Sequence, residues 1–151
     1  MRSLIIVALI AFVGVSCSSS EDPDPVNEVN IPSDQADALL ALNGTNMKSW
    51  VTKRFTLAGV QLDCRADDVI MLHADGTFDY DGGDNLCGLQ DNARTRTGTW
   101  ELDLENRTFT VELNTGVIYS GEFQKITENE LIMTGNWGGM SIRATFVPSE
   151  S

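Results

Sequence analysis

After Gly44 the chain consists of short runs in which apolar and polar residues alternate, separated by residues that form turns. The pattern is clearest in 99–104 (TWELDL) and in 140–146 (MSIRATF). Because successive side chains of a β-strand point to opposite faces of its sheet, a period of two predicts strands with one buried face. Pairs such as Asp75-Gly76 and Gly138-Gly139 between the runs are typical of hairpin turns. The pattern predicts an all-β fold built from hairpins.

The alternating runs predict eight strands joined mostly by short turns. Their expected ranges are 48–57, 68–73, 77–81, 96–104, 108–113, 117–126, 130–137 and 140–147. Short connections place consecutive strands antiparallel, and a sheet of eight strands with one apolar face buries that face and loses its exposed edges by closing on itself. We therefore predict an eight-stranded antiparallel up-and-down barrel. A two-sheet sandwich is the alternative, but the short connections after Trp100 disfavour its crossovers.

The first third of the chain divides into three parts. Residues 1–16 have one basic residue and an apolar run, Leu4–Val15, that is too short to span a bilayer, which is typical of a secretory signal peptide. Residues 17–32 are rich in Ser, Asp and Pro and predict a flexible acidic tether that contributes nothing to the core. The barrel domain is expected over 33–151, beginning with one short N-terminal helix in 33–44, which has capping and helix-forming residues and ends on Gly.

Cys17 directly follows the small residues that end the predicted signal peptide. This arrangement resembles the lipobox of bacterial lipoproteins, which implies cleavage before Cys17 and its acylation. Ordinary secretion with an incidental cysteine is the alternative. The Ser-rich and acidic residues after Cys17 resemble the surface-export signal of Bacteroidota lipoproteins. The resemblance implies an outer-membrane lipoprotein of the bacterial cell envelope that is held to the membrane by its N-terminal acyl chains and displayed at the surface.

Two further cysteines, Cys64 and Cys87, remain for the exported domain. An even pair in an oxidising compartment predicts a disulfide. Each lies in one of the two long segments between strands, 58–67 and 82–95, so the bridge is expected to join these segments. A zinc site is disfavoured because the chain has one histidine and no Cys-x-x-Cys pair.

The charge of the chain excludes one class of partner. With 22 acidic and 10 basic side chains the formal net charge is −12, which repels nucleic-acid backbones. We expect a monomer, with no nucleic-acid partner and no cofactor.

No residue pattern indicates catalysis. His73, the single imidazole, lies beside a predicted turn and is expected to be structural, so the chain is not expected to be an enzyme. Asp79, Asp81 and Asp84 lie close together around glycines and form a weak calcium candidate, but the bidentate Glu of a calcium loop is missing. An acidic turn is the alternative for this segment.

The order and spacing of several short motifs carry a family resemblance over roughly residues 39–148. These motifs are Lys48-Ser49-Trp50, Cys64, the hairpin His73–Phe78, Cys87, Thr97–Leu102 and Asn129–Met133. Together they resemble the lipocalin-like domain lipoproteins of Bacteroidota. The resemblance implies a small calycin-type barrel, and most members of that family have no assigned activity.

The function depends on what fills the barrel. An eight-stranded barrel is wide enough either to be filled by side chains or to hold one small ligand. The first hypothesis is a binding protein for a small hydrophobic ligand or glycan, with five residues as its tentative lining: Trp50, Trp100, Phe109, Met133 and Trp137. The alternative is a surface interaction module with a filled barrel, which contacts a protein or glycan through loops such as 82–95.

Overall fold

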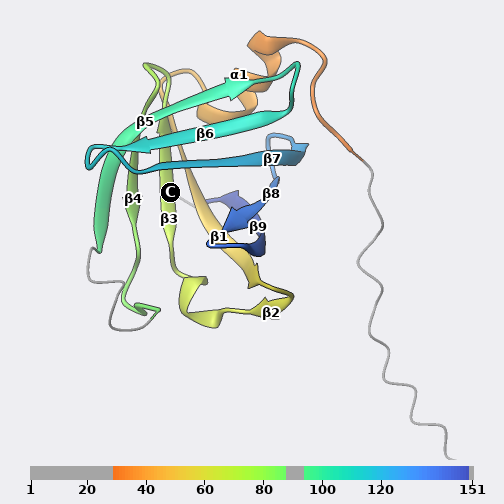
Figure 1. The fold of residues 1–151 in the computed structure, drawn as a ribbon. Coiled ribbons are helices and arrows are strands. Elements are labelled where there is room, and N and C mark those ends of the chain that lie inside the picture. Colours follow the sequence, from red (N-terminus) through yellow and green to blue (C-terminus); the bar gives the residue numbers. More distant parts are fainter. Residues whose placement is uncertain (1–28, 88–93, 150–151) are drawn as a thin grey trace, which may run out of the picture.

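The strands of the computed structural model, which describes residues 29–87 and 94–149, form one antiparallel sheet that closes into a barrel (Figure 1). The barrel strands are β1 (Met47–Leu57), β3 (Val69–His73), β4 (Thr77–Asp81), β5 (Thr95–Asp103), β6 (Thr108–Leu113), β7 (Ile118–Ile126), β8 (Leu131–Trp137) and β9 (Met140–Pro148). Each predicted strand is confirmed to within one residue at either end. The eight-stranded up-and-down barrel is therefore confirmed, and the sandwich alternative is not the fold.

Two short elements were not predicted. Strand β2 (Val60–Gln61) pairs with the end of β1, and the 3₁₀-helix η1 (Asp63–Arg65) follows it. Both lie in the segment expected to be a long irregular loop, and a two-residue strand is too short to show alternation. They fold this segment back against the end of β1.

Strand β1 closes the barrel by pairing on both of its sides. Its first half pairs with β3 from Met47 to Val51, and most of its length pairs with β9. A register shift between Thr52 and Arg54 lets both Thr52 and Phe55 line the interior, because an extra residue reverses the alternation. The long strand can thus bend and remain apolar on its inner side.

Helix α1 (Gln35–Asn43) covers one end of the barrel. Asp34 caps its first turn by accepting hydrogen bonds from the backbone N–H groups of Ala36 and Asp37. The helix buries Ala38 and Leu42 completely in the core. This helix position agrees with the prediction and explains why that end of the barrel is filled.

The segment preceding α1 corrects one expectation. Ile31 packs against the core, and the backbone N–H of Ile126 donates to the Asn30 carbonyl at 2.8 Å. The prediction that residues 18–32 contribute nothing to the core is therefore wrong for Ile31. A single apolar residue among polar ones carries no periodic signal, which is why the sequence pattern missed it.

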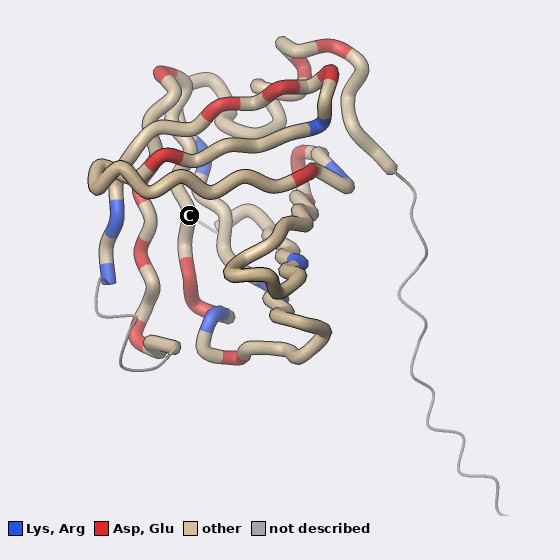
Figure 2. Tube along the Cα trace, in the orientation of Figure 1, with Lys and Arg blue, Asp and Glu red and all other residues tan. Residues whose placement is uncertain are grey.

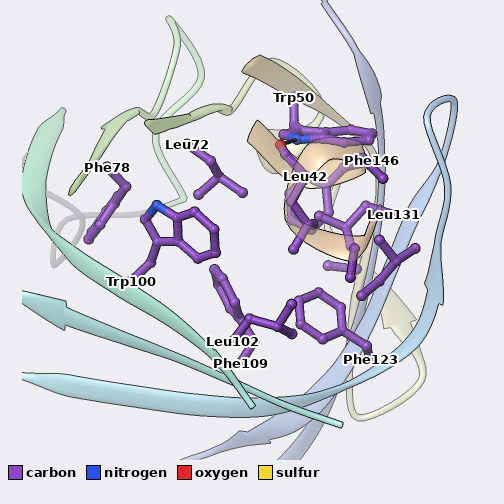
Figure 3. Packing of buried hydrophobic residues seen from close by; sticks show 14 residues of the cluster. Leu42, Trp50, Leu72, Phe78, Trp100, Leu102, Phe109, Phe123, Leu131 and Phe146 are labelled. Carbon is purple, nitrogen blue, oxygen red and sulfur yellow. Dashed lines mark hydrogen bonds between the residues drawn. The ribbon is translucent and has the colours of Figure 1, made fainter. Parts of the chain in front are cut away.

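Fourteen buried apolar residues from α1 and the barrel strands form the core beneath the helix, as Figure 3 shows. Trp50 is fully buried, and its indole N–H donates to the Leu42 carbonyl at 2.8 Å. Phe109 packs on Trp100 and on Phe123, with ring centroids 5.8 and 5.2 Å apart. Gly98 allows β5 to approach β6 closely, since a Cβ there would overlap the Glu112 carbonyl oxygen.

Candidate ligand cavity

The barrel contains a cavity of about 240 Å³ at the end opposite α1, which we call the mouth end. Most of the side chains that line it are apolar. They are Phe55, Ile70, Phe78, Phe109, Val111, Leu113, Met133, Trp137, Ile142, Ala144 and Phe146. Tyr119 and Trp137 line the cavity while 40% and 44% of their surfaces are exposed. The cavity therefore reaches solvent at the mouth end.

Buried aromatic rings form the inner end of the cavity. Phe78, Phe109 and Phe146 line it and are each 5% exposed, and they belong to the same core cluster as Trp100 and Phe123. The interior is thus filled beneath α1 and hollow toward the mouth. The sequence left open whether side chains fill the barrel or leave room for a ligand. The barrel has both, a filled interior at one end and a cavity at the other.

One part of the cavity wall is polar. The Arg65 Nη1 donates to Asp68 Oδ2 at 3.2 Å and to the Tyr80 hydroxyl oxygen at 2.7 Å, and the Tyr80 hydroxyl donates to the same Asp68 oxygen at 2.6 Å. The guanidinium of Arg96 lies over the Tyr80 ring, 5.5 Å from its centroid. All four residues line the cavity. We call them the polar wall, and they give a mostly apolar cavity one side with charged groups that can hydrogen-bond.

Burial dominates the electrostatics of the polar wall. Asp68 is 4% exposed, and its Oδ1 is buried without a hydrogen-bond partner. Burial raises the pKa of Asp68, while its hydrogen bond from Tyr80 and the charge of Arg65 oppose the rise. The carboxyl group is therefore easier to protonate than an ordinary aspartate.

A disulfide and a loop hold the polar wall in place. Cys64, in η1, is bonded to Cys87, as predicted, with the two Cα atoms 5.3 Å apart. Asp67 Oδ2 accepts hydrogen bonds from the backbone N–H groups of Asp84 and Asn85 at 2.7 and 3.2 Å. Gly83 has a φ of +62°, and a Cβ there would overlap the Asp67 carboxyl group. The segment after β4 is thus fixed against the segment that carries Arg65 and Asp68.

The five predicted lining residues divide between the two ends of the barrel. Phe109, Met133 and Trp137 line the cavity. Trp50 and Trp100 do not line it but lie in the filled core, where Figure 3 shows Trp100 beside Phe109 and Trp50 beside Leu42. The inward direction expected for Trp100 is confirmed, since it is 7% exposed.

Lys48 helps to close the barrel at the α1 end. Its ammonium group lies over the Trp50 ring, 4.2 Å from the centroid, and donates to the carbonyl oxygens of Ala41 and Glu128 at 2.9 and 2.7 Å. Burial lowers the pKa of Lys48, and the charge of Glu128 opposes this. These contacts join β1 to α1 and to the β7–β8 turn, so a ligand would enter from the mouth end.

The three acidic residues of the calcium candidate have separate partners. Asp79 contacts His73 Nε2 at 2.8 Å, Asp81 accepts from the Gly83 N–H at 3.0 Å, and Asp84 pairs with Arg94. Within residues 29–87 and 94–149, no group of three or more His, Cys, Asp or Glu side chains could hold a metal ion. Cys17, the predicted acylation site, lies outside the described residues.

The sequence analysis missed most of the polar wall. Arg65 lies in the segment 58–67, for which no element was expected, and Asp68 is the first residue of the strand expected over 68–73, whose continuous apolar run does not indicate an inner face. Tyr80 lies two residues after Phe78 in β4, so the alternation of the strand places both side chains on the same face. Arg65 directly follows Cys64, but the predicted disulfide does not indicate in which direction the Arg65 side chain points.

Comparisons with known proteins leave the family open. Among the described residues, none of the helices has the length and apolar character needed to span a membrane. No protein-family model and no curated protein matches this chain.

Proposed function

We propose that this protein is a lipid-anchored binding protein of the bacterial cell envelope that holds a small, mostly apolar molecule inside its barrel. The observation that carries the proposal is the cavity of about 240 Å³ at the mouth end. Ligand sites are typically concave and apolar with a few placed polar groups, and this volume lies just below their usual range of about 300–1,000 Å³. The size favours a compact ligand.

The polar wall supports an orientation for that ligand. Its apolar body would lie against Phe109, Met133 and Val111, and a polar group would face Arg65 and Tyr80. Since the other polar side chains of the lining are the uncharged hydroxyls of Thr52, Ser120, Thr134 and Tyr119, the polar wall is its charged side and would favour ligands whose polar group faces it. A glycan with an apolar sugar face satisfies the same description, so the proposal includes it.

The test is a fluorescence titration of the purified protein with a neutral naphthalene dye. We expect saturable binding by the parent and loss of binding by Val111→Phe, because the larger ring occupies the cavity that Val111 lines. Glu112→Phe is the matched control, since it places the same ring on the exposed face of β6. A parent that binds no dye, or a Val111→Phe variant that binds as well as the parent while remaining folded, would contradict the proposal.

A further inference from the structure

Two neighbouring hairpins at the mouth end present a group of exposed apolar side chains. Val117, Ile118 and Tyr119 lie at the β6–β7 turn and are 43%, 61% and 40% exposed. Trp137 and Met140 flank the β8–β9 turn, pair with each other across it, and are 44% and 45% exposed. We call these five residues the mouth rim.

Strand pairing makes the mouth rim continuous. Gly121 of β7 pairs with Gly135 of β8, and Tyr119 and Trp137 each lie two residues nearer the mouth on these neighbouring strands. Both residues also line the cavity. The exposed apolar surface and the opening of the cavity therefore share the same side chains.

Exposed apolar residues gather at this end of the molecule. Ten large hydrophobic residues are exposed in the described part of the chain, and seven of them lie at the mouth end: the five of the mouth rim, Val60 and Leu86. Scattered exposed apolar residues are normal, whereas a cluster indicates a binding surface.

Acidic residues lie at both ends of the barrel, since the mouth-end segments 57–69 and 81–87 carry five acidic and one basic residue, but the mouth rim itself is uncharged. The segments that connect elements at the α1 end, 33–46, 73–77, 103–108 and 126–131, carry seven acidic and one basic residue. Figure 2 shows acidic residues near α1 and along the β5–β6 hairpin. The two hairpin turns of the mouth rim, 113–118 and 137–140, carry no charged residue.

From this exposed, uncharged and apolar rim we propose that the mouth rim contacts the surface of a lipid bilayer. An uncharged apolar surface gains free energy by leaving water, and Tyr and Trp favour the interface where one side is apolar and the other wet. A protein surface can also bury apolar residues, but the bilayer is favoured because the predicted anchor holds the domain beside it.

The length of chain before the barrel permits this orientation. The twelve residues from Cys17 to Glu28 precede the first described residue. Fully extended, they span at most about 40 Å, since each residue contributes about 3.3–3.6 Å. A nine-residue strand such as β7 rises about 30 Å. A tether that starts at the α1 end is therefore long enough to let the mouth end reach the membrane.

This membrane contact rests on the proposed binding function and adds a route by which the ligand reaches the cavity. With the mouth rim at the bilayer surface, an apolar ligand would pass between the membrane and the cavity without crossing bulk water. The acyl chains at Cys17 would keep the protein nearby, and the mouth rim would orient it.

Trp137 provides a direct test, because Trp50 and Trp100, the other two tryptophans, are 0% and 7% exposed. The full chain is reconstituted into phosphatidylcholine vesicles whose acyl chains carry bromine, which quenches tryptophans that touch the hydrocarbon. We expect quenching of the parent and little quenching of Trp137→Phe, whose two remaining tryptophans are shielded. An unquenched parent would overturn the proposal.

The double variant Ile118→Ser/Met140→Ser tests the mouth rim itself. We expect it to lower the fraction of quenched Trp137 on the order of tenfold, since two apolar side chains no longer enter the interface. Leu40→Ser is the matched control, because Leu40 is 52% exposed at the α1 end. Equal quenching in both variants would contradict the mouth rim as the contact.

Two further outcomes separate the competing explanations. Trp137 that becomes shielded from iodide in lipid-free solution as protein concentration rises would assign the mouth rim to a second copy of the chain and overturn the membrane contact. Dye binding without lipid quenching would leave the proposed binding function standing and remove the membrane contact alone.

Discussion

Asp68 shows how a single residue of the cavity wall responds to its surroundings. It is buried beside Arg65, yet one of its two carboxyl oxygens has no hydrogen-bond partner. Burial of a charge costs free energy unless its partners fully compensate, and here the balance raises the pKa of Asp68. The folded protein therefore binds a proton at this site more readily than the unfolded chain does.

The raised pKa of Asp68 predicts the direction in which the free energy of unfolding changes with pH. The contribution of Asp68 is fully present below the pKa of an ordinary aspartate, about 3.9, and is lost as pH rises through the higher folded value. Asp68→Asn cannot ionise, so its free energy of unfolding should increase relative to that of the parent as pH rises through this window. Denaturant unfolding at several pH values measures the difference.

Asp75 provides a control of opposite sign. It accepts hydrogen bonds from the N–H and the hydroxyl of Thr77, and these lower its pKa. Its contribution is present above the ordinary aspartate pKa and is lost as pH falls, so Asp75→Asn should lose stability relative to the parent as pH rises. If both variants show the same trend, the interpretation of Asp68 is wrong.

At the scale of elements, the Cys64–Cys87 disulfide joins the two irregular segments of the mouth end. It links η1 to the segment after β4, and Asp67 adds hydrogen bonds to the same segment. Cys64 and Cys87 both lie outside the paired strands of the barrel. The bridge therefore stabilises the part of the barrel wall that carries Arg65 and Asp68.

We expect Cys64→Ser/Cys87→Ser to lower the free energy of unfolding by about 3 kcal/mol, because the open chain regains the entropy that a loop of this length loses. For a domain of this size the melting temperature should fall by about ten degrees. Calorimetry measures the loss, and the dye titration shows whether the cavity persists.

A parent protein that is isolated with two free thiols, or a variant as stable as the parent, would count against this role. Loss of dye affinity together with stability would show that the bridge also shapes the cavity.

How far the sequence predicts each element depends on its periodicity. In 99–104 and 140–146 the alternation predicts a strand and its inward side chains, while the observed strands, Thr95–Asp103 and Met140–Pro148, extend beyond these runs. The same rule placed Trp100 and Phe109 inside. Alternation does not indicate how far along the barrel axis an inward side chain lies. It therefore did not show that Trp50 and Trp100 pack in the core beneath α1, whereas Met133 and Trp137 line the cavity. Depth depends on how α1 packs on the barrel, which is a tertiary property.

At the scale of the whole molecule, the barrel has two different ends. One end is filled and covered by α1, and the other holds the cavity and the mouth rim. We propose two membrane contacts for this domain, the acyl chains at Cys17 and the mouth rim. The relative strength of these two contacts can be measured.

Cys17→Ala should move most of the protein from the membrane fraction to the soluble fraction after cell lysis, because a few apolar side chains bind a bilayer far more weakly than acyl chains. The melting temperature of the domain should be unchanged, since Cys17 lies twelve residues before the first described residue. Fractionation with immunodetection measures the first effect and thermal unfolding the second. Complete retention of the variant in membranes, with removal of the signal segment confirmed, would contradict acylation as the anchor.

The pairing of β1 with β9 also has a consequence for the proposed export of the chain. Val51 pairs with Val147 and Leu57 with Ile142, so the seam joins residues that are separated by most of the domain. Such distant contacts form late, and until β9 arrives both β1 and β8 present open edges to other chains. A chain whose β9 has not yet been translocated cannot close the barrel. In the proposed export, aggregation would therefore be avoided only if these edges are shielded until the last strand emerges.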